Sequence, residues 1–138
     1  MKVVIIDGQG GRLGSLIVEG LIKEAVPCEM LAVGTNSIAT SAMLKAGAKV
    51  GATGENPVIV AARDADVIIG PIAIVAADSL YGEITPEMAV AVGQSRAVKF
   101  LLPVSHCRNQ VVGVKALSMS EMAGEAVTAV KLMAGEAK

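Results

Sequence analysis

Aromatic residues are nearly absent from this chain, which has one tyrosine, one phenylalanine and no tryptophan among 138 residues. Proteins that hold single-stranded nucleic acid commonly stack its bases on aromatic side chains, and this sequence offers no such platform. The 12 basic and 13 acidic residues leave a net charge of −1, without the basic excess that nucleic-acid surfaces carry. We therefore expect no nucleic-acid partner.

Cysteines and long apolar runs are also scarce. Cys28 and Cys107 form neither a metal-binding pattern nor a disulfide framework, so we expect a reduced, cytoplasmic protein. Too few apolar residues precede Asp7 to form a signal peptide. The longest uncharged apolar stretch, residues 67–77, is too short to cross a bilayer, and we expect no membrane partner.

Apolar residues are nevertheless abundant, at 53% of the chain, and the mean hydropathy is +0.61. The length fits one domain over residues 1–138. For a small domain this composition predicts apolar surface buried between subunits, and hence a homo-oligomer. A core rich in alanine and valine would give the same figure.

The sequence is organised around a glycine-rich stretch. Residues 3–6 are apolar and β-branched, and residues 13–24 have helical apolar spacing, so a strand-to-helix turn is predicted between them. The glycines do not fit G-x-G-x-x-G, but Gly8, Gly11 and Gly14 fit G-x-x-G-x-x-G. In either spacing one glycine makes the turn, one lets the backbone approach an anion, and one lets the helix pack against the strand.

Backbone N–H groups at such a helix start can hold a phosphate, so the turn predicts a nucleotide-like ligand. A purely structural turn is the alternative. The predicted contacts in this stretch are Gly8, Gln9, Gly10, Gly11, Arg12, Leu13 and Gly14.

Strand-like and helix-like segments alternate along the whole chain. The pattern predicts an α/β fold, a Rossmann-like three-layer sandwich with a mostly parallel sheet of five to six strands and helices on both faces. Strands are expected at residues 3–6, 30–33, 48–52, 66–70, 99–104 and, as a sixth, 110–114. Helices are expected at residues 13–24, 38–46, 57–63, 86–95 and 119–133. Residues 72–81 fit no element.

Small or polar residues follow five of the expected strands, at residues 7–11, 34–37, 53–56, 70–71 and 105–109. Ligands of open α/β sheets bind outside the carboxyl ends of the strands, and the first, second and fourth exits should lie closest together. These exits add further predicted contacts, namely Gly34, Thr35, Asn36, Ser37, Gly70 and Pro71.

Two features bear on the kind of nucleotide. Asp7 would repel an anion beside it, so it either ligates a cation, binds a hydroxyl or caps the glycine turn. A NAD site usually has an acid after the second strand for the ribose hydroxyls, and residues 33–37 contain none. NADP, or another phosphorylated ligand, is therefore favoured over NAD. Asn36 or Ser37 could also cap the next helix.

Catalytic candidates are few: Asp7, Asp78, Tyr81 and His106. His106 and Cys107 are adjacent and point in opposite directions on an extended chain, so they form no dyad. Tyr81 lacks the lysine that follows the tyrosine of short-chain dehydrogenases by four residues, since Thr85 stands there. The chain also has no serine nucleophile elbow, paired histidine ligands or Walker lysine. No reaction is predicted.

Four segments resemble an uncharacterised family of small bacterial proteins, known only as a domain of unknown function. The segments are residues 6–11, 34–43, 70–72 and 82–89, so the resemblance spans most of the chain. It implies a stand-alone bacterial domain and brings no activity. Separately, residues 11–14 resemble the turn of some small nicotinamide-dependent reductases.

The leading hypothesis is a domain that binds a phosphorylated nucleotide, NADP-like rather than NAD-like, on the turn at Gly8–Gly14. One alternative is a non-enzymatic accessory or sensor subunit with an apolar interface. Another is an enzyme that acts on a small phosphorylated substrate with a divalent cation at Asp7.

Overall fold

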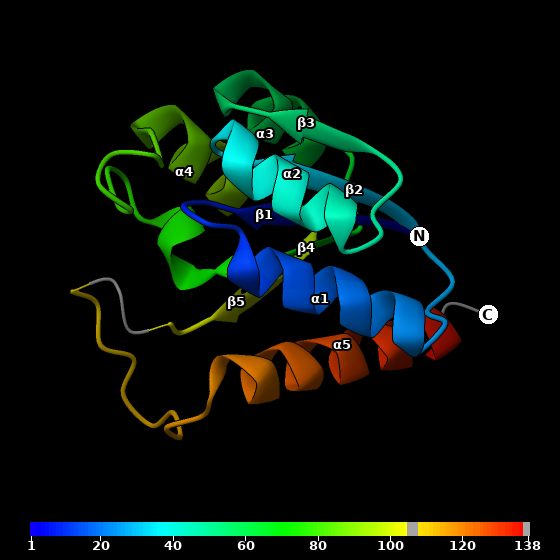
Figure 1. Ribbon diagram of the computed structural model, residues 1–138. Coiled ribbons are helices and arrows are strands. Elements are labelled where there is room, and N and C mark those ends of the chain that lie inside the picture. Colours follow the sequence, from blue (N-terminus) through cyan, green and yellow to red (C-terminus); the bar gives the residue numbers. More distant parts are fainter. Residues whose placement is uncertain (105–107, 137–138) are drawn as a thin grey trace.

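The computed structural model describes residues 1–104 and 108–136. Strands and helices alternate along it (Figure 1). The strands are β1 (Lys2–Asp7), β2 (Glu29–Gly34), β3 (Gly51–Thr53), β4 (Val67–Pro71) and β5 (Val98–Leu102). The helices are α1 (Arg12–Lys23), α2 (Ser37–Lys45), α3 (Glu55–Ala62), the short 3-10 turn η1 (Ile72–Val75), α4 (Pro86–Gln94) and α5 (Met119–Glu136).

The strands form one parallel sheet in the order β3-β2-β1-β4-β5. This is the Rossmann strand order, in which the connection from β3 crosses to the far side of β1. The exits of β2, β1 and β4 are therefore neighbours at one edge of the sheet. The prediction that the first, second and fourth exits lie closest is confirmed.

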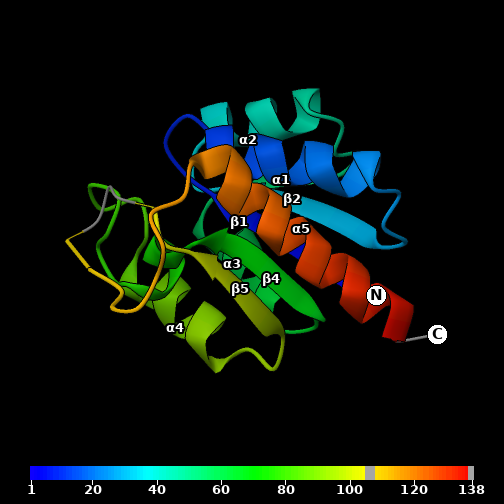
Figure 2. The same ribbon diagram turned by 90° about the horizontal axis from the view of Figure 1, so that it is seen from below.

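Helices cover both faces of the sheet, as Figure 2 shows. Helices α1, α2 and α5 lie on one face, where a core forms around Ile5, Ile17 and Val130. Helices α3 and α4 lie on the other face, where a second core forms around Ile6 and Met88. The predicted α/β three-layer architecture is confirmed, and alternate residues of β1 enter opposite cores because successive strand side chains point to opposite faces.

Local signals place the helix starts. The Asn36 side chain caps α2 by accepting the N–H of Ala39 at 2.9 Å. The Thr85 hydroxyl caps α4 by accepting the N–H of Met88, and Pro86 takes the first helical position. These caps satisfy N–H groups that the first turn of a helix leaves without partners.

Two stretches differ from or extend the sequence prediction. Residues 108–118 contain no strand, so the sixth strand predicted at 110–114 is wrong. Gly113, at φ 86°, turns the chain there, and Val112 is 96% exposed. Residues 72–81, left unassigned above, form η1 and most of a loop that continues to residue 85 and folds back over the carboxyl edge of the sheet.

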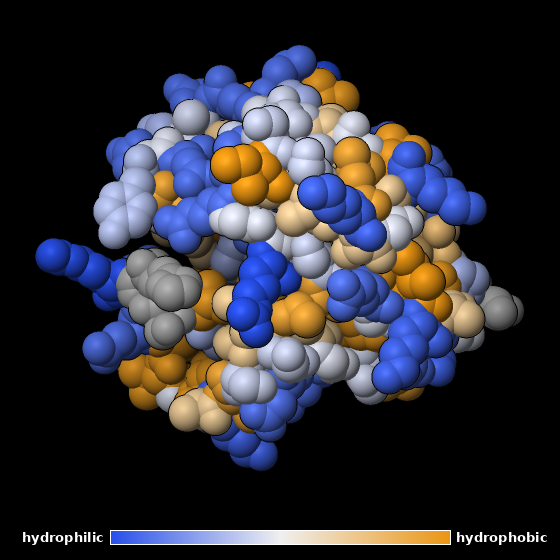
Figure 3. Space-filling model, in the orientation of Figure 1, coloured by the Kyte–Doolittle hydropathy of each residue, from blue (hydrophilic) through white to orange (hydrophobic). Residues whose placement is uncertain are grey.

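No helix among residues 1–104 and 108–136 is long and apolar enough to cross a membrane. On the face formed by α1, α2 and α5, apolar side chains are scattered in separate patches among polar ones (Figure 3).

Candidate functional site

Asp7 ends β1 and caps the glycine turn from beneath. Its Oδ1 accepts the backbone N–H of Gly8 at 2.8 Å, and its Oδ2 accepts the N–H of Gly14 at 2.7 Å. The side chain is buried, with the residue 6% exposed. Of the three roles considered for Asp7, the structure shows the cap.

Burial raises the pKa of Asp7 above its ordinary value, and the hydrogen bonds from Gly14 and Gly8 oppose that rise. The neighbouring Glu83 carboxylate adds a smaller increase to the pKa. Two acids therefore lie close together at this end of the sheet, which is the opposite of a simple basic phosphate pocket.

The glycines of the turn have different surroundings. A Cβ on Gly14 would lie 2.5 Å from Sδ of Met43 and 3.0 Å from Cβ of Asp7, so this glycine lets α1 pack closely against α2 as well as against the strand that the prediction named. Gly11 has φ 74°, and a Cβ there would lie 2.8 Å from the backbone of Ala39. A Cβ on Gly10 would meet nothing within 4 Å. Gly10 is thus the glycine with open space above the backbone.

A small pocket of about 180 Å³ opens beside the turn. Within the described residues, the backbone N–H groups of Gly10, Arg12 and Leu13 donate to no protein acceptor, and all three residues line this pocket. The other lining residues are Asp7, Gly8, Gln9, Gly11, Pro71, Leu80, Val104 and Met119. The structure therefore brings the whole predicted turn except Gly14 to one pocket with Pro71.

The exit of β2 is occupied by Glu83, from the loop before α4. Its Oε1 accepts three hydrogen bonds: from Thr35 Oγ1 at 2.6 Å, Asn36 Nδ2 at 2.7 Å and the Gln9 N–H at 2.9 Å. Burial alone would raise the pKa of Glu83, but these hydrogen bonds together lower it. Glu83 was absent from the predicted contacts, and no sequence pattern links it to a turn 74 residues away.

Three other predicted contacts, Gly34, Gly70 and Ser37, lie outside the pocket. A Cβ on Gly34 would lie 2.3 Å from Thr40 Oγ1, and one on Gly70 would lie 2.3 Å from the carbonyl oxygen of Ile6. Ser37 is exposed at the first position of α2. Close packing therefore accounts for Gly34 and Gly70, and neither they nor Ser37 line the pocket.

The catalytic candidates are not assembled into a site. Only Asp7 lines the pocket, Asp78 is exposed, and the Tyr81 side chain is fully exposed on the loop surface. His106 and Cys107 lie outside the described residues. Among the residues that the structure describes, no three His, Cys, Asp or Glu side chains are grouped to hold a metal ion.

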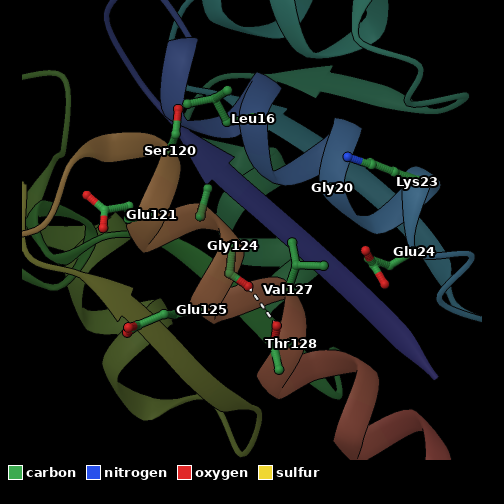
Figure 4. A pocket seen from close by; sticks show the side chains of 11 residues that line it. Leu16, Gly20, Lys23, Glu24, Ser120, Glu121, Gly124, Glu125, Val127 and Thr128 are labelled. Carbon is green, nitrogen blue, oxygen red and sulfur yellow. Dashed lines mark hydrogen bonds between the residues drawn. The ribbon is translucent and has the colours of Figure 1, made fainter.

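A larger hollow, of about 700 Å³, lies between α1 and α5 (Figure 4). It follows the crossing of the two helices, where Gly20 faces Val127 and a Cβ on Gly20 would lie 2.8 Å from that valine. Figure 4 shows the Thr128 hydroxyl turned back onto the carbonyl of Gly124, at 3.0 Å. This hollow is the groove between two packed helices.

The strand order, together with the glycine turn that Asp7 caps at the end of β1, defines a Rossmann-type α/β domain. Residues 2–134 match the family described as Domain of unknown function (DUF3842), and the chain belongs to that family. No curated protein matches it.

Among solved structures, a dodecameric FMN-dependent UbiX-like decarboxylase from Escherichia coli O157:H7 is similar. The identity is 16% and the TM-score 0.41, over 96% of this chain and 76% of the decarboxylase chain. At that level of similarity nothing about ligand or assembly transfers to this chain.

Proposed function

We propose that this domain binds the phosphate group of a nucleotide or a related phosphorylated small molecule on the turn at Gly8–Gly14. The observation that carries the proposal is the set of three N–H groups, of Gly10, Arg12 and Leu13, that have no partner in the described chain and belong to residues lining one pocket. They stand at the start of α1, where the helix dipole favours an anion.

The Arg12 side chain supports the same ligand. A cation in the first turn opposes the helix dipole, and α1 has no acid in that turn to offset it. Arg12 is exposed and makes no ion pair within the described residues. A bound phosphate would supply the missing negative charge and accept hydrogen bonds from the guanidinium.

The turn already accepts anions from its own chain. Asp7 takes the N–H groups of Gly8 and Gly14, and Glu83 takes that of Gln9. These contacts support an electropositive backbone, but their charges also repel a third anion. Arg12 is the group that offsets this repulsion on the pocket side.

The preference for NADP over NAD rested on the absence of an acid at the β2 exit. Glu83 supplies a carboxylate there, and a 2′-phosphate beside it would meet like charge. The Glu83 carboxylate therefore removes the reason for favouring NADP over NAD. Nicotinamide binding of either kind remains a proposal.

The divalent-cation alternative has little support, because both oxygens of Asp7 accept backbone hydrogen bonds. The accessory-subunit alternative needs a continuous apolar patch, and on the face drawn in Figure 3 the exposed apolar side chains are scattered.

Titration of Arg12→Gln with phosphorylated compounds tests the proposal. The panel is inorganic phosphate, ribose 5-phosphate, AMP, ATP, NAD and NADP, with and without magnesium. We expect at least one compound to bind, and Arg12→Gln to weaken it by about tenfold or more, the value of one charged hydrogen bond.

Arg63→Gln is the matched control, because Arg63 is exposed at the far end of α3. Equal losses in the two variants, or no binding by the unmodified protein, would contradict the proposal.

A further inference from the structure

Glu83 reaches across the end of β1 to the exit of β2. The groups that it engages are those that would face a nucleotide ribose in this strand order, namely the Thr35 hydroxyl and the Asn36 amide. It also takes the Gln9 N–H, one residue before the open Gly10. A ligand on this side of the turn would have to displace the carboxylate from three hydrogen bonds.

The loop holds Glu83 firmly in that place. The next residue, Ile84, is 1% exposed and anchors the chain in the core around Ile6. The Asp78 N–H donates to the Ile84 carbonyl at 2.7 Å, and the Ile84 N–H donates to the Ser79 carbonyl at 3.2 Å. The loop is therefore closed on itself by backbone hydrogen bonds.

Gly8 is covered by the same loop. A Cβ on Gly8 would lie 2.8 Å from Thr35 Oγ1, 2.9 Å from Leu80 Cδ1 and 3.1 Å from Glu83 Oε1. Ligand atoms cannot approach the backbone of Gly8 from this side while the loop stays in place. The β2 side of the turn is closed.

The other side of the turn is open and leads into a small pocket. The pocket beside Gly10 and Arg12 has walls of Leu80, Pro71, Val104 and Met119, so it extends toward β4 and β5. Its volume of about 180 Å³ is below the 300–1,000 Å³ that is usual for organic ligand pockets. It has room for a phosphate and a small organic group, whereas an extended dinucleotide would have to reach out of the pocket.

We propose that Glu83 is the residue that determines ligand specificity, because it closes the β2 side of the turn and confines the ligand to a compact phosphate monoester. The proposal rests on the proposed function above and narrows its ligand class. Glu83 acts by exclusion, through occupied donors and like charge, and makes no contact with the ligand.

Binding of ribose 5-phosphate and NAD to the Glu83→Ala variant tests this inference. The unmodified protein should bind the monoester more tightly than the dinucleotide. Removing the side chain frees Thr35, Asn36 and the Gln9 N–H, so Glu83→Ala should bind NAD about tenfold more tightly or better, with ribose 5-phosphate changed by less than about threefold.

Glu83→Gln is the second variant, since it keeps the shape and the loop but removes the charge. Its neutral oxygen holds the three donors less strongly, and a smaller gain in NAD affinity is expected. Glu87→Ala removes an equal charge from an exposed position in α4 and should leave both affinities unchanged.

The results distinguish failure of the inference about Glu83 from failure of the proposed phosphate binding. If ribose 5-phosphate binds but the ratio of the two affinities is the same in all variants, or the unmodified protein prefers NAD, Glu83 has no such role while phosphate binding stands. If no variant binds either compound, phosphate binding at the turn is refuted, and this inference with it.

Discussion

At the scale of single residues, the glycines of the turn differ in whether protein atoms surround them. Gly11 and Gly14 stand in the G-x-x-G-x-x-G spacing, yet both are packed against α2. Gly10 lies outside that spacing and has the open space that an approaching phosphate needs. The spacing alone could not show this, because it depends on where α2 lies.

Gly10→Ala should therefore separate binding from folding. Its φ is not among the positive values and its Cβ would meet no protein atom, so the free energy of unfolding should change by less than about 0.5 kcal/mol. The added methyl group would stand where the phosphate approaches the backbone, and affinity for a phosphate ester should fall by about tenfold or more. Calorimetric titration and urea unfolding measure the two quantities.

Gly11→Ala is the matched comparison and should behave in the opposite way. Its positive φ and its contact with the Ala39 backbone should cost about 1–3 kcal/mol of stability. If Gly10→Ala bound phosphate esters as tightly as the unmodified protein, the phosphate would not lie over Gly10.

Glu83 gives the stability of the protein a specific pH dependence. Its pKa in the folded state lies below its ordinary value of 4.5, so its stabilising contribution is complete above pH 4.5 and is lost as the pH falls through the folded pKa. Glu83→Gln should cost about 1 kcal/mol at pH 7, where the charged hydrogen bonds are made. The difference between the two proteins should shrink below pH 4.5.

Urea unfolding at several pH values between 7 and 3 measures that difference. A difference that stays constant over this range would mean that the Glu83 carboxylate is not held by its three donors.

At the scale of elements, local signals predicted the helices well. Thr85 with Pro86, Asn36, and Ser118 with Glu121 each stand at the start of a helix that was expected from the sequence. Such signals work because a cap and the N–H that it satisfies lie within three residues of each other.

The cap of α5 offers a direct measurement. Ser118 Oγ accepts the Glu121 N–H, and Glu121 Oε1 accepts the Ser118 N–H, each at 3.1 Å. Ser118→Ala should lower the free energy of unfolding by about 1 kcal/mol, seen as a fall of a few degrees in Tm. Ser120→Ala, in the first turn of the same helix, should change it by less than about 0.5 kcal/mol. Equal effects would show that the capping box contributes nothing.

Residues 72–85 and 108–118 could not be predicted in the same way. The first segment is fixed by contacts far along the chain, such as those of Glu83 with Gln9 and Thr35. The second has the β-branched composition of a strand but pairs with none in the described chain. Composition predicts which secondary structure a segment favours, but only the fold decides whether a neighbouring strand is present for it to pair with.

The candidate site shows the same limit. The sequence located the turn and the strand exits, because alternating strands and helices predict a parallel sheet whose carboxyl ends share one edge. It could not find Glu83, and so it left the β2 exit without an acid. The preference for NADP over NAD was derived from that missing acid. Glu83, which lies in the loop before α4, supplies the acid and removes the basis of the preference.

At the scale of the whole molecule, two cores explain much of the apolar composition. Every residue from Val3 to Ile6 is fully buried, and small alanines fill both helix layers. They leave several exposed apolar side chains unexplained. Among these are three valines in the segment that follows β5, an edge strand of the sheet: Val111 is 41%, Val112 96% and Val114 48% exposed. Self-association remains a prediction, and this edge is the place where the structure would support it.

Light scattering of the purified protein at micromolar concentration tests self-association. We expect a mass that is a multiple of 14.0 kDa, and Val112→Lys should shift it toward the single chain, because a charge in this exposed apolar segment opposes its burial against a second subunit. Val60→Lys, a substitution of a half-exposed valine on α3, should leave the mass unchanged. If the unmodified protein has a mass of 14.0 kDa, the homo-oligomer prediction is wrong and the valines have no partner in a second copy. If both variants keep the mass of the oligomer, the subunits meet through another surface.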